Sequence, residues 1–171
     1  KHNLLVGERT AEEMKKQISD FPGLNLVTTV YGDDLADKSY REANGLLTSQ
    51  PNVKVIVAPT TVGVLAASQA VKDAGKIGEV YVTGLGLPSE MAGAIKSGAT
   101  KEFAIWNPID LGYSATQIAY RLVKGDTDGA PGSEIEAGRM GKIKVGDNGE
   151  AAMADPFVYN ASNVEEFAKI F

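Results

Sequence analysis

The chain has 171 residues, a length that suits one domain with a substantial buried core. Its 17 basic and 22 acidic residues give a net charge of −5 without any basic run, which excludes the electrostatic footprint of a nucleic-acid-binding protein. A hydrophobic content of 43% excludes intrinsic disorder, and the absence of cysteine excludes disulfides, thiol catalysis and cysteine zinc sites.

Four apolar runs with strand character each precede a segment of helical pattern. They are Leu24 to Tyr31, Val53 to Pro59, Glu79 to Gly84 and Glu102 to Trp106. Strands that alternate with helices predict a parallel sheet, and the spacing of the runs is that of βα units. We therefore expect an α/β fold with a doubly wound parallel sheet.

Capping residues and helix breakers indicate where the helices begin and end. We expect helices from Thr10 to Asp20, from Asp33 or Asp34 to Gln50, from Thr61 to Ala74, from Pro88 onward, and from Asp110, as the cap, to Lys124. The Ala- and Val-rich helix from Thr61 is the one expected to pack on the sheet.

The pattern changes after Gly132. Residues 140–145 and 151–159 flank an Asp-Asn-Gly sequence and predict a hairpin, and Ser162 begins a capping box for a short last helix. We therefore divide the chain into an α/β lobe, residues 1–131, and a C-terminal hairpin, return segment and last helix, residues 132–171.

Histidine chemistry has almost no basis in this sequence, because His2 is the only histidine. Adjacent acids such as Glu12-Glu13 are typical of helix starts, where they compensate the dipole. We therefore predict no catalytic residue, no metal site and no cofactor. One enzyme alternative stays open: the loop from Gly84 to Ser89 follows a strand and precedes a helix, as a nucleotide phosphate loop does, although its third glycine is replaced by Ser89.

Ligands of open parallel α/β sheets bind at the carboxyl ends of the strands. The loops at that edge are Tyr31 to Asp33, Pro59 to Thr61, Gly84 to Leu87 and Trp106 to Pro108. They offer hydroxyl, amide and aromatic groups with little charge. A pyranose stacks its C–H face on an indole and needs neutral donors and acceptors, so this edge favours a sugar. Two structural alternatives remain: Trp106 is a half-buried core aromatic, or Thr60 and Thr61 cap a helix.

Three segments of this edge carry a resemblance to a known family: Val57-Ala58-Pro59-Thr60-Thr61, residues 82–88, and residues 103–113 with their Trp106-Asn107-Pro108 core. Together they resemble periplasmic sugar-binding proteins of the ribose-binding type, most closely the rhamnose-type receptors of ABC importers. The resemblance implies one lobe of a type I periplasmic binding protein. Such a receptor holds a sugar between two lobes, delivers it to a membrane permease and catalyses nothing.

The same resemblance implies a set of ligand-binding residues, which are Thr60, Thr61, Gly84, Leu85, Gly86, Trp106, Asn107 and, as a weaker candidate, Arg9. Many relatives place an aspartate in the loop held here by residues 84–86, and its absence suggests a deoxy sugar. The chain resembles only the second half of its relatives, so we expect an oligomer, an element swap or a longer parent protein. The effector domain of a sugar-responsive repressor shares the architecture and is a second alternative.

Overall fold

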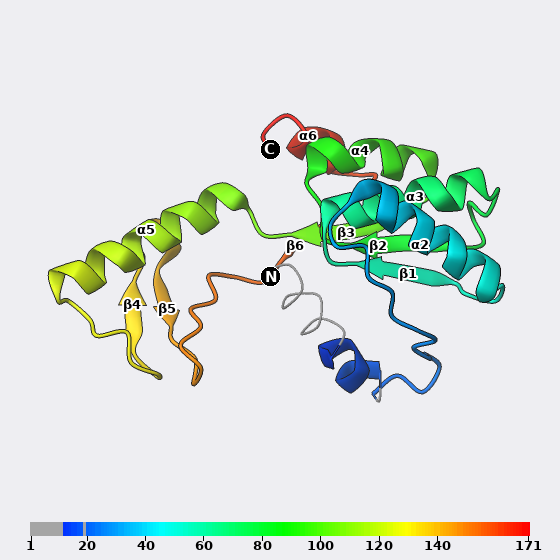
Figure 1. Ribbon diagram of the computed structural model, residues 1–171. Coiled ribbons are helices and arrows are strands. Elements are labelled where there is room, and N and C mark those ends of the chain that lie inside the picture. The colour runs from blue at the N-terminus through cyan, green and yellow to red at the C-terminus, as the bar shows by residue number, and fades with distance from the viewer. Residues whose placement is uncertain (1–11, 19) are drawn as a thin grey trace. The chain divides into compact units, whose positions relative to one another are not determined.

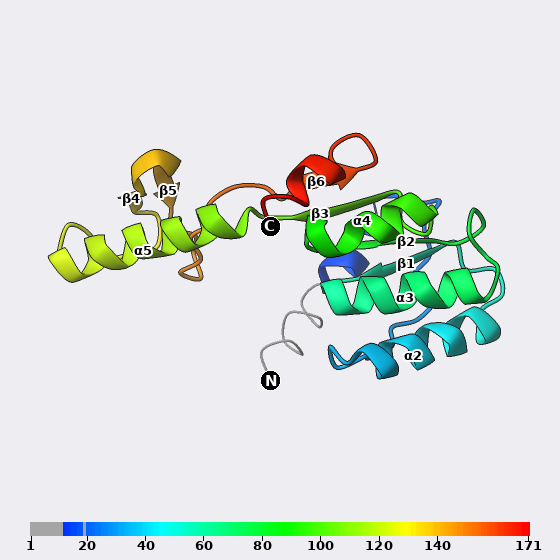
Figure 2. The same ribbon diagram turned by 90° about the horizontal axis from the view of Figure 1, so that it is seen from above.

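The computed structural model describes residues 12–18 and 20–171. The chain divides into two compact units. Unit 1 contains the described residues up to 104 together with residues 158–171, and unit 2 contains residues 105–157 (Figures 1 and 2). The predicted division after residue 131 stays a prediction. None of the helices among the described residues is both long enough and apolar enough to span a membrane.

Unit 1 contains the parallel strand pairing that the sequence predicts. Two pairs of strands are present: β1 (Val55–Ala58) with β2 (Tyr81–Gly84), and β3 (Glu102–Ile105) with β6 (Phe157–Asn160). β1 pairs in parallel with β2, and a parallel bridge from Leu85 to Ala104 sets β3 beside the end of β2. β6 pairs with β3. Three of the four expected parallel strands are thereby confirmed.

The helices of unit 1 are α2 (Ala36–Ser49), α3 (Thr61–Asp73), α4 (Pro88–Ser97) and α6 (Val164–Phe167). α3 packs on β1 and β2 and contacts α2 and α4, while α4 contacts α6. Figure 1 shows α2, α3 and α4 on one side of the strands. α3 can pack closely because it is rich in small and β-branched apolar residues, of which Val64, Ala70 and Val71 are fully buried. The helix expected from Thr10 is present over residues 12–18.

An aromatic cluster closes the core of unit 1 at its C-terminal segment. The Tyr159 side chain is 1% exposed, and its ring stacks on Phe103 with 5.3 Å between ring centroids. Phe167 and Phe171 meet the same ring edge-on. Burial raises the pKa of the Tyr159 hydroxyl. The segment after β6 is therefore held by packing of large side chains, in the geometry that aromatic pairs prefer.

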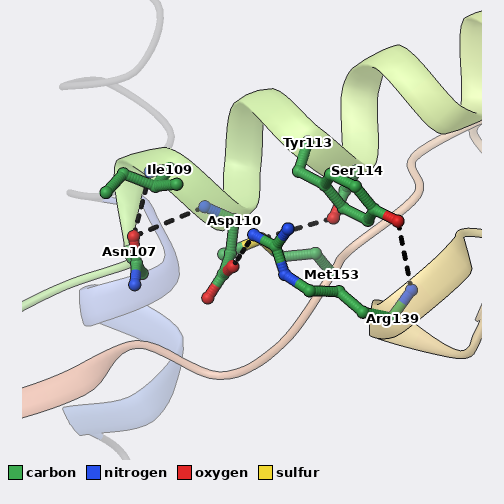
Figure 3. Close-up of polar contacts among 7 residues, drawn as sticks. All are labelled: Asn107, Ile109, Asp110, Tyr113, Ser114, Arg139 and Met153. Atoms are coloured by element: carbon green, nitrogen blue, oxygen red, sulfur yellow. Dashed lines mark hydrogen bonds and ion pairs between the residues drawn. The ribbon is translucent and has the colours of Figure 1, made fainter.

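Unit 2 consists of one long helix and a small antiparallel pair. Its elements are α5 (Pro108–Lys124), β4 (Glu134–Glu136), the 3₁₀ turn η1 (Gly138–Met140) and β5 (Lys142–Lys144). β4 pairs with β5 so that Ile135 faces Ile143, and both side chains are 2% exposed. α5 contacts β4 and η1. Arg139 of η1 pairs with Asp110 of α5 and lies over the Tyr113 ring (Figure 3).

The strand predicted from Leu24 to Tyr31 does not form. A strand exists only where a neighbouring strand takes its backbone hydrogen bonds, and no described strand pairs with this segment. Val27 and Tyr31 are 46% and 50% exposed, and on β1 Val55 is also half exposed. Residues 24–31 have strand propensity, but a strand forms only when a neighbouring strand pairs with it.

The expected aspartate cap of α2 is wrong. Asp33 and Asp34 have φ angles of 53° and 57°, whereas a helix N-cap residue is extended. Leu35 occupies the N-cap position, with no side-chain cap bond. Asp33 instead pairs with Lys38 in the first turn of the helix.

The predicted hairpin is also wrong, although its turn is present. Gly149 has a φ of 81°, and the Gly146 N–H donates to the Glu150 carbonyl across the turn at 2.7 Å. Only one bridge, between Val145 and Ala151, follows it. β5 pairs with β4 upstream, and β6 pairs with β3, so the backbone groups of the two segments are used by other strands.

The short last helix is confirmed, but Ser162 does not cap it. Asn163 is at the N-cap position of α6, and both the backbone N–H and the hydroxyl of Ser162 donate to Asn160 Oδ1. The serine therefore belongs to the turn that follows β6.

Candidate functional site

The two threonines at the carboxyl end of β1 hold the start of α3. Thr60 is the N-cap residue, and its Oγ1 accepts a hydrogen bond from the Gly63 N–H at 3.0 Å. Thr61 Oγ1 accepts from the Leu87 N–H at 3.2 Å, which ties α3 to the loop after β2. The expected capping role is thus present at Thr60. Both hydroxyls act only as acceptors in these bonds, and each keeps its own hydrogen for donation.

The loop after β2 comes close to β1, and Gly84 makes this approach possible. Its φ is +144°, and a β-carbon there would lie 1.7 Å from the Ala58 carbonyl oxygen. The Leu85 N–H donates to that same oxygen at 3.1 Å. At Gly86 a β-carbon would lie 2.6 Å from Met91 Cγ. Backbone atoms require glycine at position 84, whereas a larger residue at position 86 would displace the Met91 side chain. The bond from the Leu87 N–H to Thr61 places the two threonines and residues 84–86 at one edge of unit 1.

The backbone N–H groups of this loop are already used. The Leu85, Gly86 and Leu87 N–H groups donate to the Ala58 carbonyl, the Ala104 carbonyl and the Thr61 hydroxyl. Pro88 has no N–H group, and the Ser89 N–H donates to the Phe171 carbonyl at 3.2 Å. A phosphate site at a helix start needs N–H groups that point at the ligand. This arrangement argues against the phosphate-loop alternative.

The other two expected site residues, Trp106 and Asn107, begin unit 2. Asn107 Oδ1 accepts from the N–H groups of Ile109 and Asp110 at 2.9 and 3.4 Å, so Asn107 caps α5 (Figure 3). The Trp106 side chain is 37% exposed, and its Nε1–H donates to the Ala154 carbonyl at 2.9 Å. Trp106 is therefore half-buried, with its polar atom paired to the backbone. Arg9 lies outside the described residues.

The expected cap at Asp110 is wrong, because Asn107 takes that position three residues earlier. Asp110 Oδ1 instead accepts from Arg139 at 2.6 Å, and the guanidinium centre of Arg139 lies 3.9 Å from the Tyr113 ring centroid. The sequence interpretation missed this cluster. Asp110 and Tyr113 are one turn apart on α5, but nothing local indicates that Arg139 returns to them.

A cavity of about 550 Å³ lies at the opposite edge of unit 1, before the amino ends of β2 and β3, and includes none of the expected site residues. Its lining includes Ile77, Tyr81, Ile95, Lys101 and Asn160. Among the described residues no three histidine, cysteine or acidic side chains gather as a metal site would require. The expected site residues of unit 1 are thus distinct from this cavity.

Thr60→Ala is expected to lower the free energy of unfolding by about 1 kcal/mol, because the N-cap bond to Gly63 is lost. Urea denaturation followed by circular dichroism measures this. Thr48→Ala, at an exposed position within α2, is the matched control and should change stability by only a few tenths of a kcal/mol. Equal effects of the two changes would contradict the capping role.

The chain is similar to known proteins in both sequence and structure. A family model described as the periplasmic binding protein domain matches residues 5–127. A sugar ABC transporter from Actinomyces odontolyticus is similar at 38% identity with a TM-score of 0.78, over 92% of this chain and 51% of that chain. An ABC transporter solute-binding protein from Clostridium phytofermentas with bound L-rhamnose is similar at 37% identity with a TM-score of 0.81, over 93% of this chain and 53% of that chain.

A more distant structure extends the likeness of the fold. An ABC transporter solute-binding protein from Agrobacterium vitis, bound with alpha-D-tagatopyranose, is 20% identical with a TM-score of 0.71, over 94% of this chain and 49% of that chain. At this identity only the fold is shared. The chain spans about half the length of each of these three proteins.

Proposed function

Because the chain belongs to the periplasmic binding protein family, we propose that it is the sugar-binding part of a receptor that serves an ABC importer. Unit 1 has the α/β architecture of one lobe of the type I fold in that family. The favoured ligand is a neutral deoxy sugar of the rhamnose kind. The receptor works in the periplasm, passes the sugar to a membrane permease and performs no catalysis.

The observation that carries this proposal is the neutral edge of unit 1. The hydroxyls of Thr60 and Thr61 lie beside the glycine loop, and neither the two threonines nor residues 84–86 bear a charge. Neutral hydroxyl and amide groups match the hydroxyls of a neutral sugar. The likeness to a solute-binding protein that holds L-rhamnose supports the same ligand class.

The expected ligand residues have different roles in this proposal. Thr60 and Thr61 donate their O–H hydrogens to sugar oxygens, because their oxygens already accept from the backbone. Leu85 and its flanking glycines offer an apolar, carboxylate-free surface for a deoxy carbon. Trp106 offers its ring face to the C–H groups of the sugar. Asn107 donates through its amide nitrogen, since its oxygen caps α5. Arg9 stays a prediction.

The nucleotide alternative is weaker because the N–H groups of residues 85, 86, 87 and 89 are paired within the chain. The repressor effector alternative shares the lobe architecture. The two similar proteins at 37% and 38% identity are transporter proteins, which favours the importer reading.

Titration with L-rhamnose, followed by fluorescence, tests the proposal. Trp106 is the single tryptophan of the chain, so a change in emission reports on one ring. We expect saturable quenching with L-rhamnose and weaker binding of L-mannose, which adds a hydroxyl at C6, by roughly tenfold to a hundredfold. Free tryptophan amide in the same titration controls for bulk effects. The same titrations are repeated by calorimetry. If no neutral sugar quenches the fluorescence and none gives a heat of binding, the proposal is overturned.

A further inference from the structure

Trp106 lies beside one of the two places where the chain passes between the units. The chain leaves unit 1 after Ala104 and returns to it at Val158. Trp106 directly follows β3, and Ala154 lies a few residues before β6 begins at Phe157. β3 and β6 pair with each other as strands. Both connecting segments therefore run together, and Trp106 and Ala154 stand just beyond their paired part.

The bond from Trp106 Nε1 to the Ala154 carbonyl, at 2.9 Å, links these two segments. Tryptophan has one polar hydrogen and no acceptor, so this bond uses its whole hydrogen-bonding capacity. The side chain is still 37% exposed. What remains available to a ligand is a surface of the ring, with no polar atom.

The neighbouring residue provides a second anchor for the returning segment. Met153 Sδ lies 3.8 Å from the Ser114 Oγ, and Ser114 is 2% exposed on α5 (Figure 3). A methionine fills irregular space and makes weak polar contacts through its sulfur. α5 itself begins with the Asn107 cap, directly after Trp106. Met153 thus contacts the second turn of α5, and Ala154 is bonded to the residue that precedes the α5 cap.

From these contacts we infer that residues 153–154 are positioning residues, which hold the Trp106 indole so that it meets a sugar only through its ring face. The inference rests on the proposed function for its ligand. The anchoring itself stands on contacts within unit 2. Ala154 acts through its backbone carbonyl, and Met153 acts by fixing that carbonyl to α5 through Ser114.

Hydrogen exchange of the Trp106 indole in the ¹⁵N-labelled chain tests the anchoring without any ligand. The Nε1–H signal should exchange much more slowly than that of free tryptophan. Met153→Ala should speed this exchange severalfold, since it removes the Ser114 contact. Met140→Ala, a methionine of the same unit outside this contact, is the matched control and should leave the rate unchanged. Exchange at the free rate in the wild-type chain, or equal effects of the two variants, would overturn the inference.

Sugar binding tests the second half of the inference. Replacing Trp106 with 3-benzothienylalanine exchanges the N–H for sulfur and keeps the bicyclic ring. We expect the Kd for L-rhamnose to rise about tenfold, the effect of losing the one hydrogen bond that orients the ring. Met153→Ala should weaken the sugar severalfold and Met140→Ala should not. An unchanged Kd in the benzothienyl protein would overturn the positioning role.

The failure of the proposed function can be distinguished from the failure of the Trp106 anchoring. If the wild-type chain binds no sugar while its indole N–H is protected and responds to Met153→Ala, the proposed function fails and the anchoring stands. If sugar binds and the indole N–H leaves Ala154 for the sugar, the indole resonance shifts strongly on saturation. That result would support the proposed function and overturn contact through the ring face alone.

Discussion

Gly84→Ala should remove at least about 3 kcal/mol from the free energy of unfolding, a large share of the total stability of a domain. Gly84 has a φ of +144°, which side-chain-bearing residues rarely adopt. An added β-carbon would lie 1.7 Å from the Ala58 carbonyl oxygen, so β1 and β2 would have to separate. That separation also breaks the bond from the Leu85 N–H to the same oxygen.

Urea denaturation of the purified variant measures this effect. Gly93→Ala is the matched control, because Gly93 is within α4 and its added β-carbon would meet nothing within 4 Å. There the change should raise stability by about 0.5–1 kcal/mol, since alanine is the better helix former. If the Gly84→Ala protein were as stable as the wild type, the close approach of Gly84 to the Ala58 carbonyl would be contradicted.

Tyr159→Ala should lower the free energy of unfolding by about 3–5 kcal/mol, as large aromatic truncations in cores do. The side chain is 1% exposed and packs between Phe103, Phe167 and Phe171. Its removal leaves a cavity whose lining aromatic rings lose their partners. It also loosens the attachment of α6 to the rest of unit 1.

The same denaturation experiment compares Tyr159→Ala with Tyr120→Ala. Tyr120 lies on α5 and is 51% exposed, so its truncation should change stability by no more than about 0.5 kcal/mol. The contrast separates burial from the mere loss of a tyrosine. Similar losses for both variants would contradict the position of Tyr159 in the core.

The sequence was a good guide wherever local pattern and tertiary demand agree. β1, β2 and β3 lie within three of the expected apolar runs, and α3 begins at the expected Thr61. Pro88 begins α4, as its fixed φ and missing N–H favour. These segments form as predicted because β1 pairs with the next strand, β2, and α3 packs on both of them.

Predictions failed where the outcome depends on a distant partner. Residues 24–31 have strand propensity, but no described strand pairs with them, and β6 pairs with the distant β3 rather than with β5. Cap identities failed for a related reason. Asp33 and Asp34 adopt positive φ, and Asp110 is drawn to Arg139, 29 residues away. Local propensity cannot decide between a helix cap and a long-range ion pair.

The candidate site was predictable in part. The edge rule for parallel sheets placed Thr60, Thr61 and the loop at residues 84–86 together, and the structure has them at one edge. The bonds that they make were not predictable. Nothing in the sequence indicates that Leu87 would donate to Thr61, or that the Trp106 indole would donate to the Ala154 carbonyl.

The most direct test of a neutral-sugar site in unit 1 is to follow the backbone amide resonances of the ¹⁵N-labelled chain during titration with L-rhamnose. We predict saturable shifts at residues 60–63 and 84–87. The resonances of residues 77, 78, 98, 100 and 101, which line the cavity at the opposite edge, should not shift. Shifts centred on that cavity, or no shifts at saturating sugar, would contradict a neutral-sugar site at the carboxyl edge of unit 1.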